Sequence, residues 1–299
     1  MLGRRPAGED LEALWGEPPG YPPALWMLLR ALHRLPWPFG EEVLSAVFVA
    51  KALGSRGDLR RALTWASGFA SGGRRWRLAL SVLASRGRFV ARAALIGMRS
   101  ADDVRRRFAV RGEEHLQAAS GAVILLGFHV GPPYSYVALR ATGRPVTLVG
   151  LRRIPEKWSR RAWGRPEGEN RDLMLGEDGA SRATMLYRAR QVLRQGGTLY
   201  MTADAVEGSE GREAFRLVVH GRDVIVRSGW LALRRKTGAA VLPVLAHLEG
   251  RTGIVTIHPP LPKPEPDPVS DGAACRDALE RLLVDYARRF PEQCWSLAL

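Results

Sequence analysis

Residues 122–128, AVILLGF, form an uninterrupted apolar run that ends directly before His129. A short apolar run of this kind, bounded by turn residues, predicts a buried strand. Pro132 and Pro133 follow closely and are well placed to begin a helix. Because ligands of parallel α/β sheets bind outside the carboxyl ends of the strands, His129 is the first candidate site residue.

Similar apolar runs recur through the second half of the chain. They predict further strands at residues 145–150, 198–203, 215–219, 240–248 and 253–258. Helices are predicted at residues 180–195, 227–238 and 271–290. The alternation predicts an α/β fold, with a central and mostly parallel sheet flanked by helices. LVVHGRDVIV (217–226) predicts a hairpin with residues 220–223 at its turn.

The N-terminal third has a helical and basic pattern. Helices are predicted at residues 22–35, 41–53, 57–70 and 72–98. We therefore expect a helical, membrane-associating region over residues 1–106 and an α/β domain over residues 107–299. Trp26, with Arg30 and Arg34, suits a helix that lies in a membrane interface, although a packed core gives the same pattern. No spanning helix and no signal peptide are expected, because no sufficiently long apolar run is present.

The composition is strongly basic. The 299 residues carry a formal net charge of +15, and 46% of them are hydrophobic, which suffices for a buried core. A surface of this charge attracts polyanions such as anionic lipid headgroups, an acidic carrier protein or nucleic acid. A solvated basic surface without a specific partner is the other interpretation. Nucleic acid is disfavoured because no zinc finger, RNP-like motif or basic heptad helix is present.

Several other kinds of site have no signature in the sequence. Cys275 and Cys294 lack metal-ligand or redox spacing, which favours a reduced protein without disulfides. No His/Cys/Asp cluster predicts a metal, and no glycine-rich phosphate loop or G-x-S-x-G elbow is present. His220 is predicted to be a turn residue, and His247 and His258 are expected to be structural.

Five blocks of the chain occur in the order of a known family. They are GAVILLGFHVGPPYSY, TLYMTADAVEGSEGREAF, VIVRSGWLALRRKTGAAVLPV, VTIHPPL and RRFPEQCWSLAL. With FAVRGEEHLQAA upstream, this succession over residues 107–299 resembles the bacterial lipid A biosynthesis (lauroyl/myristoyl) acyltransferase family, within the wider lysophospholipid and glycerolipid acyltransferase superfamily.

The resemblance implies an acyl transfer reaction. A fatty acyl group would pass from an acyl carrier protein or coenzyme A thioester to the hydroxyl of a lipid or glycolipid acceptor. The reaction would take place at the cytoplasmic face of the bacterial inner membrane, where the protein is peripherally bound. The resemblance also implies that His129 is the general base and that no cofactor is needed besides the acyl thioester.

The acid of the family motif is replaced in this chain. The motif is histidine, four residues, then Asp or Glu, and the acid orients the imidazole. Here that position holds Tyr134, which has no charge at neutral pH to stabilise an imidazolium. In one hypothesis Asp204, after the predicted strand 198–203, or Glu207 orients His129 instead. In the other, the chain has lost or altered its catalysis and binds lipid or a partner.

Two further groups are candidates for anion binding. Arg152 and Arg153 follow the strand 145–150, align with an arginine-rich region of the family, and suit a phosphate of the acceptor or the pantetheine arm. Arg227 and Ser228 begin a predicted helix whose free N–H groups suit an anion or an oxyanion. Solvated loop arginines and an ordinary helix start are the respective alternatives.

Overall fold

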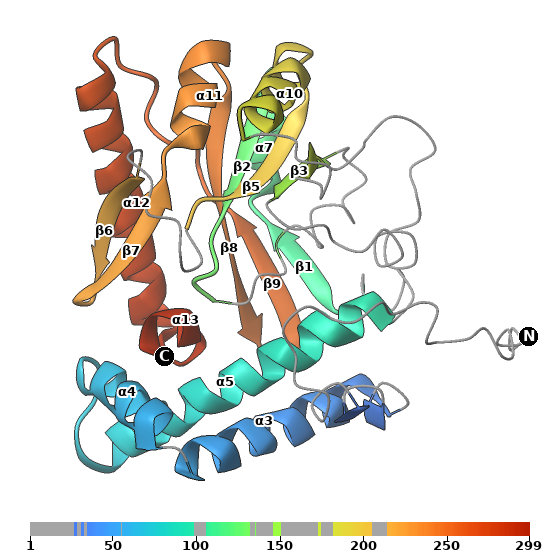
Figure 1. Ribbon diagram of the computed structural model, residues 1–299, viewed down its shortest axis with the longest axis vertical. Coiled ribbons are helices and arrows are strands. Elements are labelled where there is room, and N and C mark those ends of the chain that lie inside the picture. Colours follow the sequence, from blue (N-terminus) through green and yellow to red (C-terminus); the bar gives the residue numbers. More distant parts are fainter. Residues whose placement is uncertain are drawn as a thin grey trace, which may run out of the picture.

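In the computed structural model, the described residues are 27–28, 31–32, 35–54, 56–98, 106–131, 135, 146–150, 173–174, 182–204 and 214–299. Within them, seven strands form the main sheet (Figure 1). Their order is β1 (Phe108–Arg111), β9 (Thr252–Ile257), β8 (Ala240–Glu249), β2 (Val123–Gly127), β5 (Thr198–Thr202), β3 (Val146–Gly150) and β4 (Leu173–Met174).

The sheet is mostly parallel, as predicted. Strands β8, β2, β5, β3 and β4 all run in one direction. Strand β9 pairs antiparallel with β8, and β1 pairs parallel with β9. The connection between β8 and β9 is only Gly250 and Arg251, which is too short for a parallel crossover. The α/β class is therefore confirmed, with an antiparallel edge.

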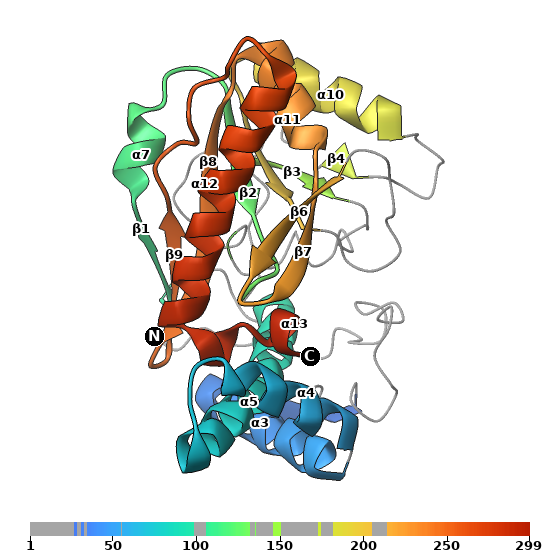
Figure 2. The same ribbon diagram turned by 90° about the vertical axis from the view of Figure 1, so that its left-hand side faces the viewer.

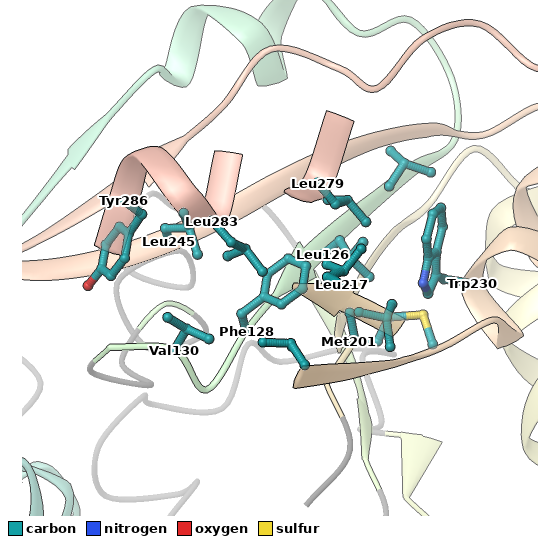
Figure 3. Close-up of a cluster of buried hydrophobic side chains, with 14 of the residues drawn as sticks. Leu126, Phe128, Val130, Met201, Leu217, Trp230, Leu245, Leu279, Leu283 and Tyr286 are labelled. Atoms are coloured by element: carbon teal, nitrogen blue, oxygen red, sulfur yellow. The ribbon is translucent and has the colours of Figure 1, made fainter. Parts of the chain in front are cut away.

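The apolar run of β2 is explained by burial on both faces of the sheet. Ile124 and Leu126 point into one hydrophobic cluster, and Val123 and Leu125 point into the other, all fully buried. On the first face, helices α10 (Arg182–Arg194), α11 (Gly229–Thr237) and α12 (Pro268–Arg289) cover the strands. Figure 3 shows Leu126 of β2 among side chains of this cluster, which include residues of α11 and α12. The second face carries Leu116 of the short helix α7 (Glu113–Ala118).

The hairpin is tighter than predicted. Strands β6 (Ala214–Val219) and β7 (Arg222–Arg227) are joined by His220 and Gly221 alone, so Arg222 and Asp223 belong to β7 and not to the turn. His220 and Gly221 have φ angles of 48° and 74°. A two-residue turn with positive φ at both positions matches the right-handed twist of the paired strands.

Three helices form an N-terminal bundle, defined here as α3 (Trp37–Gly54), α4 (Arg56–Ser67) and α5 (Gly72–Met98). Glu41 of α3 contacts Arg92 of α5, whereas Ser45 bonds the carbonyl of Ala84, so the two helices are antiparallel. Of the helix predicted at 22–35, residues 27–28 and 31–32 are helical, Leu35 lies in a bend, and the others lie outside the described residues.

The bundle lies beyond the carboxyl edge of the parallel strands (Figures 1 and 2). Arg92 of α5 donates a hydrogen bond of 2.9 Å to the carbonyl of Arg251, in the turn between β8 and β9. The chain ends between α12 and the bundle with the 3-10 turn η1 (Pro291–Gln293) and the short helix α13 (Trp295–Ala298). The edge of the sheet where His129 was predicted to lie thus faces the bundle.

Candidate active site

His129 and Asp204 are brought together by the register of two adjacent parallel strands. Gly127 at the end of β2 pairs with Thr202 at the end of β5. The pairing continues one residue further, because Ala203 N–H donates to the carbonyl of Gly127 at 2.9 Å. His129 and Asp204 each stand two residues beyond their strand, so they lie at the same depth at the same edge.

The Asp204 carboxylate contacts His129 twice. Its Oδ2 accepts the backbone N–H of His129 at 2.6 Å, and its Oδ1 lies 2.9 Å from Nδ1 of the ring. A carboxylate only accepts, so Nδ1 carries the proton and the neutral ring presents its lone pair at Nε2. Among the described residues, Nε2 has no hydrogen-bond partner. The His129 side chain is 35% exposed and that of Asp204 is 11% exposed, so the base is accessible while its acid is covered.

The surroundings make the His129 ring a stronger base. Burial is the largest single influence and lowers the pKa of His129. The hydrogen bond and the charge of Asp204 together outweigh it and raise the pKa above the ordinary value of 6.5. Stabilisation of an imidazolium by a paired carboxylate is the property that general-base catalysis requires.

Neighbouring elements hold Asp204 in place. Asp204 forms a β-bridge with Val226 of β7, and Arg227 N–H donates to the carbonyl of Ala203 at 2.8 Å. The hairpin β6–β7 therefore holds the backbone at Ala203 and at Asp204 itself. Its side chain is left to pair with His129.

A buried tyrosine supports the ends of both strands, and sequence reasoning did not single it out. Tyr200 of β5 lies so close to Gly127 that a Cβ at that position would collide with the phenol oxygen. Burial raises the pKa of Tyr200, a hydrogen bond with Ser135 lowers it, and the charge of Asp204 raises it, with a net rise above the ordinary 10.0. Tyr200 thus joins β2, β5 and the segment after His129, and it stays protonated.

Arg227 and Ser228 lie at the same edge of the sheet. Arg227 is the last residue of β7, and its backbone bond to Ala203 places it next to Asp204. Ser228 occupies the N-cap position of α11, where its hydroxyl makes no capping hydrogen bond. Both residues are half-buried. Their predicted anion contact is therefore compatible with the fold.

The other predicted site residues lie outside the described residues. These are Tyr134, Arg152, Arg153 and Glu207. Their proposed roles stay predictions.

His247 and His258 lie in or beside strands, as their sequence context suggested. His247 is buried, stacks on Phe290 with ring centroids 4.1 Å apart, and contacts Glu249 at 2.9 Å. Burial is the main cause that lowers the pKa of His258 to about 4. Within the described part of the chain, no group of three or more His, Cys, Asp or Glu side chains is arranged to hold a metal ion.

Comparison with known proteins identifies the family. The family model described as bacterial lipid A biosynthesis acyltransferase matches residues 24–297. The match includes the N-terminal bundle, whereas the motifs that carried the resemblance begin at residue 107. No curated protein matches the sequence significantly. The match covers far more than half of the chain and includes both strands that carry His129 and Asp204, so the chain belongs to the bacterial lipid A biosynthesis acyltransferase family.

Proposed function

We propose that this protein transfers a fatty acyl group from an acyl carrier protein or coenzyme A thioester to a hydroxyl of a membrane lipid or glycolipid, with His129 as the general base. The observation that carries the proposal is the double contact of Asp204 with His129, at 2.6 and 2.9 Å. It supplies a carboxylate to the imidazole in a chain whose motif acid is Tyr134.

The geometry suggests a sequence of proton transfers. Nε2 of His129 removes the proton from the acceptor hydroxyl while that oxygen attacks the thioester carbonyl. Asp204 stabilises the imidazolium through Nδ1. When the tetrahedral intermediate collapses, the C–S bond breaks and the imidazolium returns the proton to the leaving sulfur. The products are an acyl ester and a free thiol, and His129 is neutral again.

Anion-binding groups are proposed at the same edge. The first N–H groups of α11, after Arg227 and Ser228, suit the oxyanion of the intermediate or a phosphate of a substrate. Arg152 and Arg153 are proposed as further phosphate contacts, since guanidinium groups pair with phosphate in a bidentate manner. Glu207 is the second candidate to support His129 if Asp204 is removed.

The N-terminal bundle supports a peripheral position on a membrane. The exposed side of α3 is mainly apolar, with Phe39, Ala46, Val47, Ala50 and Leu53, spaced so that they share one side of the helix. Trp76, which is 49% exposed, lies near the start of α5. Among the described residues, no helix combines the length and apolar character needed to cross a bilayer.

The charge of the bundle favours an anionic lipid surface. Residues 35–98 contain ten Lys and Arg but only Glu41, Glu42 and Asp58 as acids. All three acids already pair with arginines of α4 or α5. The remaining cations would repel a second copy of the bundle, whereas anionic headgroups attract them. We therefore propose attachment to the cytoplasmic face of the bacterial inner membrane.

An acyl transfer assay tests the proposal. Purified protein is incubated with an acyl carrier protein thioester or an acyl coenzyme A, together with lysolipid and glycolipid acceptors in vesicles. Mass spectrometry then follows the acylated product. Product formation that requires His129 supports the proposal. No product with any donor or acceptor, from folded protein, would favour the alternative of a lipid- or partner-binding family member that no longer catalyses.

A further inference from the structure

The C-terminal segment, Pro291–Leu299, joins the N-terminal bundle to the edge of the sheet that carries His129. Trp65 of α4 donates its indole N–H to the carbonyl of Pro291 at 2.9 Å. Trp295 stacks on Phe89 of α5 with ring centroids 5.0 Å apart. Leu299 packs against both the sheet cluster and the bundle cluster. Figure 2 shows α13 between α12 and the bundle.

The same segment is fixed to the sheet from its other side. The amide of Gln293 bonds both backbone groups of Leu248 in β8, at 2.7 and 3.0 Å. Cys294 is fully buried next to it. Ser296 is therefore presented by a backbone that is anchored on the residues before and after it.

Ser296 contacts the backbone of His129. Its hydroxyl donates a hydrogen bond of 2.9 Å to the carbonyl oxygen of His129. Asp204 holds the backbone N–H and Nδ1 of the same residue. The backbone N–H, the carbonyl and the ring nitrogen Nδ1 of His129 are thus all hydrogen-bonded. His129 lies outside β2, so these hydrogen bonds are made with side chains and not with a neighbouring strand.

We propose that Ser296 is a positioning residue for acyl transfer: its hydroxyl holds the peptide group of His129 so that the ring stays aligned with Asp204. The inference rests on the proposed function of His129. The carbonyl carbon is bonded to Cα of His129, which also carries the ring and the nitrogen of the N–H group. A backbone shift at this carbonyl would therefore displace Cα and move both the N–H and the ring relative to the carboxylate. The anchor of Ser296 comes from the bundle, so the general base is held partly by the region proposed to meet the membrane.

The test compares Ser296→Ala with Ser296→Thr, which keeps a hydroxyl. Acyl transfer kinetics give kcat and KM. NMR titration of labelled histidine, with the His129 signal assigned by comparison with His129→Gln, gives the pKa of His129. Among the described residues, Asp204 is the charged group against the ring. A loosened ring loses part of the support from Asp204 while burial persists, so its pKa falls in Ser296→Ala. We expect kcat to fall about threefold to tenfold at unchanged KM, the size of one hydrogen bond. Ser296→Thr restores both kcat and the pKa of His129.

Ser67→Ala is the matched control. It removes another serine hydroxyl that bonds a carbonyl, at 2.7 Å, at the exposed end of α4. In Ser67→Ala we expect the kinetics of acyl transfer and the pKa of His129 to equal those of the natural protein. A His129 pKa in Ser296→Ala equal to that of the natural protein overturns the positioning role, as does a fall that Ser296→Thr does not reverse. Because the titration needs no turnover, it decides the role of Ser296 even if the natural protein transfers no acyl group, an outcome that would refute only the proposed function.

Discussion

The carboxylate of Asp204 binds the backbone N–H of His129 with one oxygen and the ring nitrogen Nδ1 with the other, at 2.6 and 2.9 Å. One side chain therefore fixes both the position of the histidine backbone and the rotation of its ring. In the family motif the acid follows the histidine on the same segment. Here the acid comes from the neighbouring strand, since the carboxyl ends of β2 and β5 are in register.

Replacement of the proposed general base should abolish transfer. His129→Ala is expected to lower kcat by about 10²–10⁴-fold, the usual contribution of a general base. The side chain is 35% exposed, so its removal opens no large cavity and circular dichroism should show an intact fold. His115→Ala on α7 is the control and should keep full activity. More than a tenth of the natural activity in His129→Ala would be incompatible with a general base.

Neutralisation of the acid should be nearly as damaging. Asp204→Asn keeps the shape of the side chain but cannot stabilise an imidazolium, and loss of the equivalent charge in serine proteases costs roughly 10⁴-fold in kcat. The control is Asp223→Asn, which removes an exposed acid that pairs with Arg216 on the hairpin surface. Full activity in Asp204→Asn would refute the assignment.

Restoration of the family motif should not help the natural protein. Tyr134→Glu restores the motif acid in a chain whose Asp204 already pairs with His129. Two carboxylates that share one imidazole raise the pKa of one of them. We expect unchanged or lower turnover in the same assay. If the natural protein is inactive and Tyr134→Glu gains activity, the chain lost its catalysis with the motif acid.

The pH dependence of transfer should report on His129. Only the neutral ring accepts a proton, so kcat/KM is low below its pKa and rises as pH increases through it. Because the pKa of His129 is raised, the midpoint should lie above 6.5. Asp204→Asn removes the hydrogen bond and charge that raise the pKa and leaves burial, so any residual activity should have its midpoint at lower pH. Rates between about pH 5 and pH 9 measure both midpoints. A midpoint that does not move in Asp204→Asn would contradict the coupling.

The pairing of His129 with Asp204 was predictable because it depends on features that a sequence shows. Each residue follows an apolar run, and adjacent parallel strands end at a common edge. Ser296 could not be found in this way. Its bond to His129 joins residues 167 positions apart and depends on how the C-terminal segment packs against α4 and α5.

Two strands of the sheet, β1 and β4, were not predicted because they are short and are defined by pairing with a distant strand. Strand β1 alternates between half-buried and exposed residues over FAVR, a pattern too short to identify without its partner β9. Strand β4 has only two residues. Helix α12 begins at Pro268, earlier than the predicted residue 271, because Asp267 caps it by accepting the N–H of Ser270.

The buried ion pair of the bundle should dominate its stability. Glu41→Ala leaves the Arg92 guanidinium buried without its carboxylate, which typically costs about 3–5 kcal/mol. Glu42→Ala is the control on the adjacent residue, where the pair with Arg88 is exposed and contributes at most about 1 kcal/mol. Urea unfolding gives both free energies. Equal losses in the two variants would show that burial of the pair does not matter.

The exposed apolar residues of the bundle should attach the protein to vesicles. The triple variant Phe39→Ser, Leu53→Ser and Trp76→Ser removes side chains that are 55%, 56% and 49% exposed. Each is expected to lose about 1 kcal/mol of burial in the lipid interface, so binding should weaken on the order of a hundredfold. Sedimentation with anionic vesicles measures the loss. Tyr187→Ser on α10, which removes an exposed aromatic residue outside the bundle, should bind as the natural protein does.

The salt dependence of vesicle binding separates the cationic contribution from the apolar one. Each Lys or Arg near an anionic surface contributes about 1 kcal/mol, and salt screens this attraction. Binding of the natural protein should therefore weaken as salt rises and should be much weaker on zwitterionic vesicles. The triple variant keeps every charge, so salt should weaken its remaining binding by a factor similar to that of the natural protein, from a lower affinity at every salt concentration. Salt-insensitive binding to both kinds of vesicle, or equal binding by the triple variant and the natural protein, would refute the bundle as the membrane-facing surface.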